Sequence, residues 1–121
     1  MNRKSKLFVL GWGKIQHPGR SHHILQQLGM EVQSKSACNA KNSKYFPITD
    51  QMICGANPRA TSNQSGCHGD SGGPFVCESN GKWTLHGAVS WGSPRCSAYD
   101  SYTVFARVAQ FRGWIDGYIN N

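Results

Sequence analysis

The chain has 121 residues, a length that suits one domain or a fragment of one. Hydrophobic residues make up 38% and charged residues 16%; no apolar run is long enough for a transmembrane helix, and no tract is biased enough for disorder. The formal net charge of +7 raises the hypothesis of a nucleic-acid or other polyanion partner, but most basic residues are scattered singly. We therefore expect a soluble basic surface, with no nucleic-acid partner and no membrane partner.

The predicted elements are short strands followed by one helix. Alternating or purely apolar runs, bounded by Gly, Pro, Asn and Ser, predict strands at 7–11, 25–32, 51–54, 74–77, 84–91 and 103–108. A short helical turn is predicted at 36–41, and Asn-Gly within 78–82 predicts a hairpin turn. Apolar residues at helical spacing predict a helix over 108–119. The count predicts an all-β fold: a six-stranded antiparallel barrel closed by a C-terminal α-helix.

The first ten residues differ in character from the rest. They are basic and then apolar, as in a signal peptide, but the apolar run is too short and no small-residue cleavage site follows. We expect no working signal peptide here. Residues 1–10 are treated as an atypical N-terminal segment, with the character of a truncated or mispredicted start, and 11–121 as one domain.

Five cysteines stand at positions 38, 54, 67, 77 and 96. None forms a Cys-x-x-Cys pair, and no histidine stands at zinc-finger spacing, so we expect no metal site and no cofactor. Cysteines at this density in a turn-rich chain favour disulfides and an oxidising compartment. Because the number is odd, one cysteine is unpaired, is bonded to another chain, or has lost its partner.

The most specific stretch is 66–74, Gly-Cys-His-Gly-Asp-Ser-Gly-Gly-Pro. Glycines on both sides of Ser71 let the backbone turn sharply and approach a substrate closely. Such a turn can aim the amides of Gly69 and Ser71 at one point, where they would stabilise an oxyanion beside the Ser71 hydroxyl. A plain glycine-rich hairpin is the simpler interpretation of the same residues.

The segment also satisfies Gly-x-Ser-x-Gly, the nucleophile elbow of α/β-hydrolases. That elbow needs a helix after the serine, and then an acid followed by a histidine. Strand-like residues follow Ser71 here, and the downstream order is His86 and then Asp100. We reject that interpretation.

Four ordered blocks carry a resemblance that covers nearly the whole chain. They are Gly-Trp-Gly at 11–13, the segment 67–74, Val-Ser-Trp-Gly at 89–92, and Val-Phe-Ala-Arg-Val at 104–108 followed by Trp-Ile at 114–115. Together they resemble the chymotrypsin-like serine peptidases, the trypsin family, over about 11–121. The resemblance implies a serine endopeptidase with two β-barrels, of which this chain contains the second.

The resemblance also implies roles for individual residues. Ser71 matches the nucleophile, Gly69 and Ser71 the oxyanion-hole amides, and Asp70 the aspartate that receives the new N-terminal ammonium after zymogen cleavage. The implied substrate-binding residues are Ser65 on the floor of the primary specificity pocket, His68 on the cleft rim, Ser90, Trp91 and Gly92 beside the substrate backbone, and Thr103 on a pocket wall.

The family's disulfides imply bridges from Cys38 to Cys54 and from Cys67 to Cys96. Cys77 is left unpaired, because its partner position in the family is occupied by Leu7 here. Asn63 begins an N-glycosylation sequon, which we interpret as a chance occurrence, since a glycan fits poorly at a pocket floor.

The family's catalytic histidine and aspartate lie on the first barrel, upstream of anything in this chain. The five histidines present are interpreted as exposed polar residues rather than substitutes: His17, His22, His23, His68 and His86. We therefore expect a secreted, extracellular peptidase half that is inactive alone, with a protein or peptide substrate and a missing N-terminal barrel as partners.

The residues of the implied pocket predict a preference. Ser65 puts no negative charge on the floor, so Arg and Lys side chains should be poor. Gly92 leaves one wall open while Thr103 shortens the pocket, which favours Leu, Met or Phe over Trp. Two alternatives stay open: a non-catalytic peptide-binding or decoy module that keeps the groove, and a basic module that binds polyanions.

Overall fold

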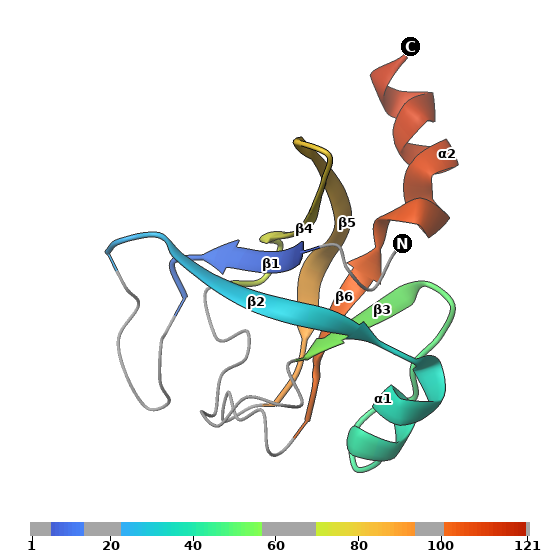
Figure 1. Ribbon diagram of the computed structural model, residues 1–121. Coiled ribbons are helices and arrows are strands. Elements are labelled where there is room, and N and C mark those ends of the chain that lie inside the picture. Colours follow the sequence, from blue (N-terminus) through green and yellow to red (C-terminus); the bar gives the residue numbers. More distant parts are fainter. Residues whose placement is uncertain (1–5, 14–22, 57–69, 94–100, 121) are drawn as a thin grey trace.

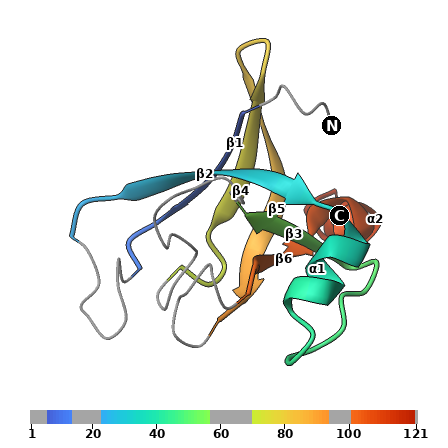
Figure 2. The ribbon, with the colours of Figure 1, turned by 60° about the horizontal axis from the view of Figure 1, so that its bottom comes forward.

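The computed structural model describes residues 6–13, 23–56, 70–93 and 101–120. Six antiparallel strands close into a barrel in the order β1-β2-β3-β6-β5-β4, with α1 beside β3 and α2 at the C-terminal end (Figures 1 and 2). The strands are β1 (Lys6–Gly11), β2 (Gln26–Gln33), β3 (Met52–Ala56), β4 (Pro74–Ser79), β5 (Lys82–Trp91) and β6 (Thr103–Arg107). The predicted six-stranded barrel is confirmed; the strands differ from prediction only at their ends.

The barrel closes where β1 pairs with β4, with Leu7 opposite Cys77. Alternate residues of the strands point inward, as the period of two requires. Phe75 and Phe105 stack at the centre, with ring centroids 4.1 Å apart and planes 9° from parallel. A Cβ added at Gly87 would lie 2.7 Å from the Phe105 Cβ. A glycine on β5 therefore makes room for the aromatic pair.

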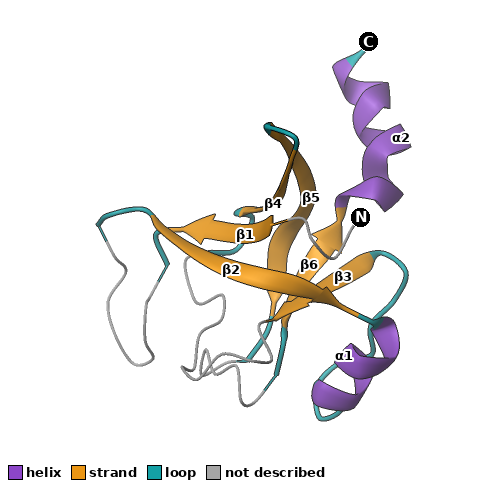
Figure 3. Ribbon diagram, viewed as in Figure 1, coloured by secondary structure: helices purple, strands orange, loops and turns teal. Residues whose placement is uncertain are grey.

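The turn between β4 and β5 is a two-residue loop. Asn80 (φ 53°) and Gly81 (φ 80°) both take positive φ, as a type I′ turn requires. The predicted turn at 78–82 is therefore correctly located, but the strands run closer to it than expected, because Ser79 pairs with Lys82. Figure 3 shows the short loop that joins β4 to the longer β5.

Helix α1 (Lys35–Lys41) covers a second apolar cluster outside the barrel. Ser34 caps its N-terminus by accepting a hydrogen bond from the Ala37 amide at 3.1 Å. Cys38 faces β3 and forms a disulfide with Cys54. The cluster packs the helix against the strands through four buried residues: Cys38, Ile48, Cys54 and Val104.

Helix α2 (Val108–Ile119) has the predicted bounds. It extends away from the barrel beyond the end of β6 and contacts chiefly β5 (Figure 1). None of its residues is buried, and the side chains of Trp114 and Tyr118 are 66% and 71% exposed. The predicted C-terminal helix is confirmed, but the pairing of β1 with β4 closes the barrel, and Trp114, Tyr118 and Ile119 of α2 stay exposed. No helix in the described part of the chain is long and apolar enough to span a membrane.

Candidate active site

Ser71 lies at the exposed corner of a tight turn. The Gly73 amide donates to the Asp70 carbonyl at 2.8 Å, and Gly72 has φ +81°. A positive φ at the third residue is the requirement of a type II turn, which glycine meets without strain. A Cβ at Gly73 would lie 2.8 Å from the Asp70 carbonyl oxygen and 2.9 Å from that of Leu10. Gly72 is thus required by the backbone conformation of the turn, and Gly73 is required by close packing.

Two hydrogen bonds fix this turn to strand β5. The Gly72 amide donates to the Val89 carbonyl at 2.8 Å, and the Val89 amide donates to the Gly73 carbonyl at 2.9 Å. Ser71 is therefore held beside the end of β5, next to the predicted substrate-binding residues that follow Val89.

Asp70 fixes the other side of the turn. Its Oδ1 accepts a hydrogen bond from the Gly13 amide at 2.8 Å. A Cβ added at Gly11 or Gly13 would overlap the Asp70 carboxylate. The Gly-Trp-Gly block at 11–13 has glycines at its ends because this carboxylate lies against its backbone. Two of the four sequence blocks are thus in direct contact.

Ser90 is the extra residue of a β-bulge. Val89 pairs with Phe105 and Trp91 with Val104, so Ser90 has no partner residue on β6. A bulge re-aims the strand and leaves its unpaired residue free of the ladder. Ser90 is exposed, whereas Trp91 is half-buried and packs against the α1 cluster. The strand end beside Ser71 therefore offers backbone groups outside the regular pairing.

Gly92 and Thr103 lie next to each other across the ends of β5 and β6. A Cβ at Gly92 would be 3.6 Å from the Thr103 Cα and from the Tyr102 carbonyl oxygen, which is ordinary contact distance. Thr103 is 3% exposed and lies on the same face of β6 as the core residue Phe105. Substitution at Gly92 is sterically possible, so its glycine is not dictated by packing.

The structural role of Asn42, at the C-terminal end of α1, was not predicted from the sequence. Its side chain is 1% exposed, accepts from the Tyr102 amide at 2.8 Å and donates to the Tyr102 carbonyl at 3.3 Å. Both bonds hold the backbone next to Thr103. An Asn after a predicted helical turn suggests a cap, but no local pattern could indicate a partner 60 positions away.

The structure brings Asp70, Ser71, Ser90 and Gly92 to one end of the barrel through the contacts above. Ser65, His68, Gly69, Cys67, Cys96 and Asn63 lie outside the described residues. Cys77 is a free, buried thiol. Among the described residues, no group of three or more His, Cys, Asp and Glu side chains could hold a metal ion.

The two described histidines, His23 and His86, make no hydrogen bond to Ser71. His86 is the extra residue of a second bulge, because Phe75 pairs with Gly87 and Val76 with Leu85. Burial of part of its ring lowers the pKa of His86 below the ordinary value of 6.5. The environment of this imidazole therefore favours its neutral form.

Comparison with known proteins identifies the family to which the chain belongs. The family model described as Trypsin matches residues 1–115, including the N-terminal segment that contributes β1. The chain is 38% identical over 118 residues to transmembrane protease serine 11G of Rattus norvegicus, which covers 97% of this chain and 28% of that protein. It is 39% identical over 113 residues to the Mus musculus protein of the same name, covering 93% and 26%. This chain spans about a quarter of the length of these relatives. It belongs to the trypsin family.

Proposed function

We propose that this chain is the C-terminal barrel of a serine endopeptidase domain, with Ser71 as the nucleophile and the amides of Gly69 and Ser71 as oxyanion donors. Family membership supports the reaction class. The observation that carries the assignment is the exposed position of Ser71 in a turn held on one side by the Asp70–Gly13 bond and on the other by Val89. A hydroxyl so placed can meet a substrate carbonyl carbon without movement of the core.

The proposed reaction also needs a base. A serine hydroxyl is a weak nucleophile until a histidine takes its proton, and an aspartate must orient that histidine. Neither His23 nor His86, the two histidines in the described part of the chain, makes a hydrogen bond to the Ser71 hydroxyl. We infer that an N-terminal barrel supplies it, and that the 121-residue chain alone hydrolyses peptides at a negligible rate.

Exposed apolar residues support such a partner barrel. On β5, Trp83 and Leu85 are 57% and 49% exposed, and on α2, which contacts β5, Trp114 and Tyr118 are more exposed still. Large apolar side chains gathered on contacting elements are typical of a surface that another domain covers. The uncovered face of α2 is one that an N-terminal barrel would bury.

Asp70 has a further role in this proposal. The family resemblance assigns it to the ammonium group that zymogen cleavage creates, and an ion pair with that group would compete with the Gly13 amide for the carboxylate. The bond from Gly13 supports this role, because it places the carboxylate against the 11–13 segment.

The proposed preference is for Leu, Met or Phe, with Trp disfavoured and Arg or Lys poor. Ser65 carries no charge to pair with a cationic side chain, and desolvating a cation without a partner is costly. The buried Thr103 beside Gly92 supports a shortened apolar pocket. A misfit of one methylene in such a pocket costs about 1–3 kcal/mol, so discrimination among the apolar residues should be modest.

The proposed location is extracellular. The Cys38–Cys54 disulfide supports an oxidising compartment. The two relatives are named as transmembrane proteases.

Peptide-library digestion tests the proposal. The lone chain should give no turnover above that of Ser71→Ala, while a protein that carries both barrels should cleave after Leu, Met or Phe. Cleavage mainly after Arg or Lys would overturn the role of Ser65. Tight peptide binding by the lone chain, together with no turnover in the two-barrel protein, would favour a non-catalytic binding module instead.

A further inference from the structure

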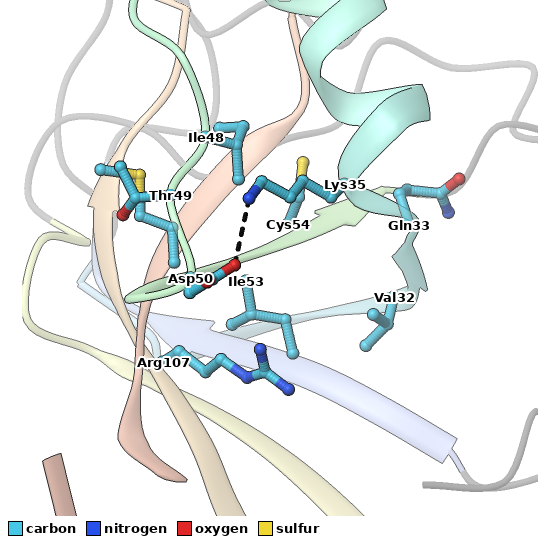
Figure 4. A pocket seen from close by; sticks show the side chains of 10 residues that line it. Val32, Gln33, Lys35, Ile48, Thr49, Asp50, Ile53, Cys54 and Arg107 are labelled. Carbon is cyan, nitrogen blue, oxygen red and sulfur yellow. Dashed lines mark hydrogen bonds and ion pairs between the residues drawn. The ribbon is translucent and has the colours of Figure 1, made fainter. Parts of the chain in front are cut away.

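A hollow of about 210 Å³ lies between the end of β2, the start of α1 and the start of β3 (Figure 4). Its lining includes Arg107 at the end of β6 and none of the described candidate active-site residues. The trypsin-family reaction as proposed above makes no use of it. The hollow is therefore separate from the candidate active site, and its lining residues indicate which ligand it could bind.

The walls combine an apolar floor with a charged rim. Val32, Ile48 and Ile53 supply apolar surface. Lys35 and Asp50 form an ion pair at 3.0 Å on the rim, with side chains 55% and 80% exposed, so their charges offset each other. Arg107 adds one further positive charge. The rim thus has a net charge of one positive unit, located at the guanidinium.

The Arg107 guanidinium is available to a ligand. Among the described residues it has no hydrogen-bond or ion-pair partner, and the first turn of α2, which follows it, has no acidic residue. Its backbone is fixed, because the Arg107 amide donates to the Gln51 carbonyl at 2.8 Å, on the loop that forms one wall. Figure 4 shows the guanidinium beside Ile53 and directed toward Val32.

We propose that this hollow binds a small organic carboxylate, with the carboxylate paired to Arg107 and an aromatic or branched apolar body on Val32 and Ile53. A guanidinium presents two parallel N–H donors that match the two oxygens of a carboxylate. One negative charge balances the net charge of the rim, whereas a doubly charged phosphate would bring one unbalanced negative charge close to the Asp50 carboxylate. The apolar floor would contact the aromatic or branched apolar body of the ligand.

The same chemistry could come from a free acid or from an acidic residue that follows an apolar one in a peptide. The probes are therefore phenylacetate for the free acid and acetyl-Phe-Asp-amide for the peptide. Phenylacetamide lacks the charge, acetate lacks the ring, and acetyl-Phe-Asn-amide is the uncharged counterpart of the peptide. Titrations followed by amide NMR of the whole chain measure the affinity and locate the site.

Phenylacetate should shift the amides of 32–35, 48–54 and 107, and bind at least tenfold more tightly than phenylacetamide or acetate. One charge-assisted hydrogen bond is worth about a factor of ten. Arg107→Gln should weaken phenylacetate binding by a similar factor. Arg112→Gln, at an exposed arginine paired with Asp116, should leave it unchanged. Tighter binding of the peptide than of phenylacetate, lost in its Asn counterpart, would identify a peptide as the source; the reverse order would identify a free acid.

Equal affinities for phenylacetate and phenylacetamide would overturn the proposal, as would shifts confined to other parts of the chain. This comparison uses the unmodified protein, so it stands even if Arg107→Gln fails to fold. Ser71→Ala should bind phenylacetate like the unmodified chain, which separates the outcome from that of the proposed peptidase function.

Discussion

Asp70 joins two segments that lie 57 residues apart in the sequence. Its carboxylate is half-buried against the 11–13 backbone, where a side chain on either terminal glycine would displace it. The conformation of the Ser71 turn therefore depends on two residues that carry no side chain. A glycine that packs against a charged group is more sensitive to substitution than one in open space.

Gly13→Ala should lower the free energy of unfolding by about 1–3 kcal/mol, because the new Cβ displaces the Asp70 carboxylate and leaves a part-buried hydrogen bond unmade. Gly113→Ala is the control. It lies on α2 with nothing near its missing Cβ, and alanine there should stabilise by up to about 1 kcal/mol. Urea unfolding compares the two; equal effects would contradict the account of Asp70.

Asn42→Ala should lower the free energy of unfolding by about 1–3 kcal/mol, because it leaves the part-buried amide and carbonyl of Tyr102 without this partner. It should also speed hydrogen exchange at the Tyr102 amide. Ser43→Ala, at the exposed neighbouring position, should change neither quantity by more than a few tenths of a kcal/mol. Unchanged exchange at Tyr102 in Asn42→Ala would show that the amide is not held by this side chain.

His86 should make the fold less stable in acid. Because partial burial lowers its pKa in the folded state, the unfolded chain binds the proton more readily, and the free energy of unfolding falls as the pH drops below about 6.5. His86→Gln should therefore lose less stability between pH 7.5 and pH 5.5 than the unmodified chain. Thr84→Ala, exposed on the same strand, should keep the original difference. Equal pH dependence in all three proteins would count against this role of His86.

At the scale of elements, β1 and β4 close the barrel, and a disulfide could be introduced between these two strands. Leu7 and Cys77 face each other across this pair, and both are buried, at 6% and 4% exposure. Facing positions on adjacent antiparallel strands lie within the range that a disulfide can bridge. A cysteine at position 7 would therefore have a thiol opposite it.

Leu7→Cys should form a bridge to Cys77 and raise the free energy of unfolding by about 2–4 kcal/mol relative to Leu7→Ser, which cannot bridge. The long loop that the bridge encloses is the reason for the size of the effect. Thiol counting under denaturing conditions and urea unfolding measure the result. A remaining free thiol at Cys77 in Leu7→Cys would contradict the register of β1 against β4.

Local patterns predicted the elements but not the contacts between distant segments. Alternation predicted the strands, and the apolar spacing over 108–119 predicted α2, because both depend on near neighbours in sequence. The bulges at His86 and Ser90 depend on the partner strand, and the Asp70–Gly13 and Asn42–Tyr102 bonds join residues 57 and 60 positions apart in the sequence. The open face of α2 was not predicted either, since amphipathic spacing says that a face is apolar but not what covers it.

At the scale of the whole molecule, the barrel has a small, well-filled core and an uncovered apolar exterior. Phe75 and Phe105 fill the centre with no exposed surface, while Trp83 and Trp114 remain more than half exposed. Exposed apolar side chains lie on β5 and α2 and also elsewhere in the described chain, for example at Trp12 and Phe46. A filled core with exposed apolar side chains outside it agrees with the proposal that a second barrel packs against this one.

The reactivity of Ser71 toward a fluorophosphonate probe tests this central claim most directly. Intact-mass measurement should show labelling of the lone chain that is as slow as that of Ser71→Ala, and fast labelling in a protein that carries both barrels, lost on Ser71→Ala. Fast, Ser71-dependent labelling of the lone chain would contradict the claim that its base comes from another barrel. Fast labelling of the two-barrel protein that persists in Ser71→Ala would contradict the assignment of Ser71 as the nucleophile.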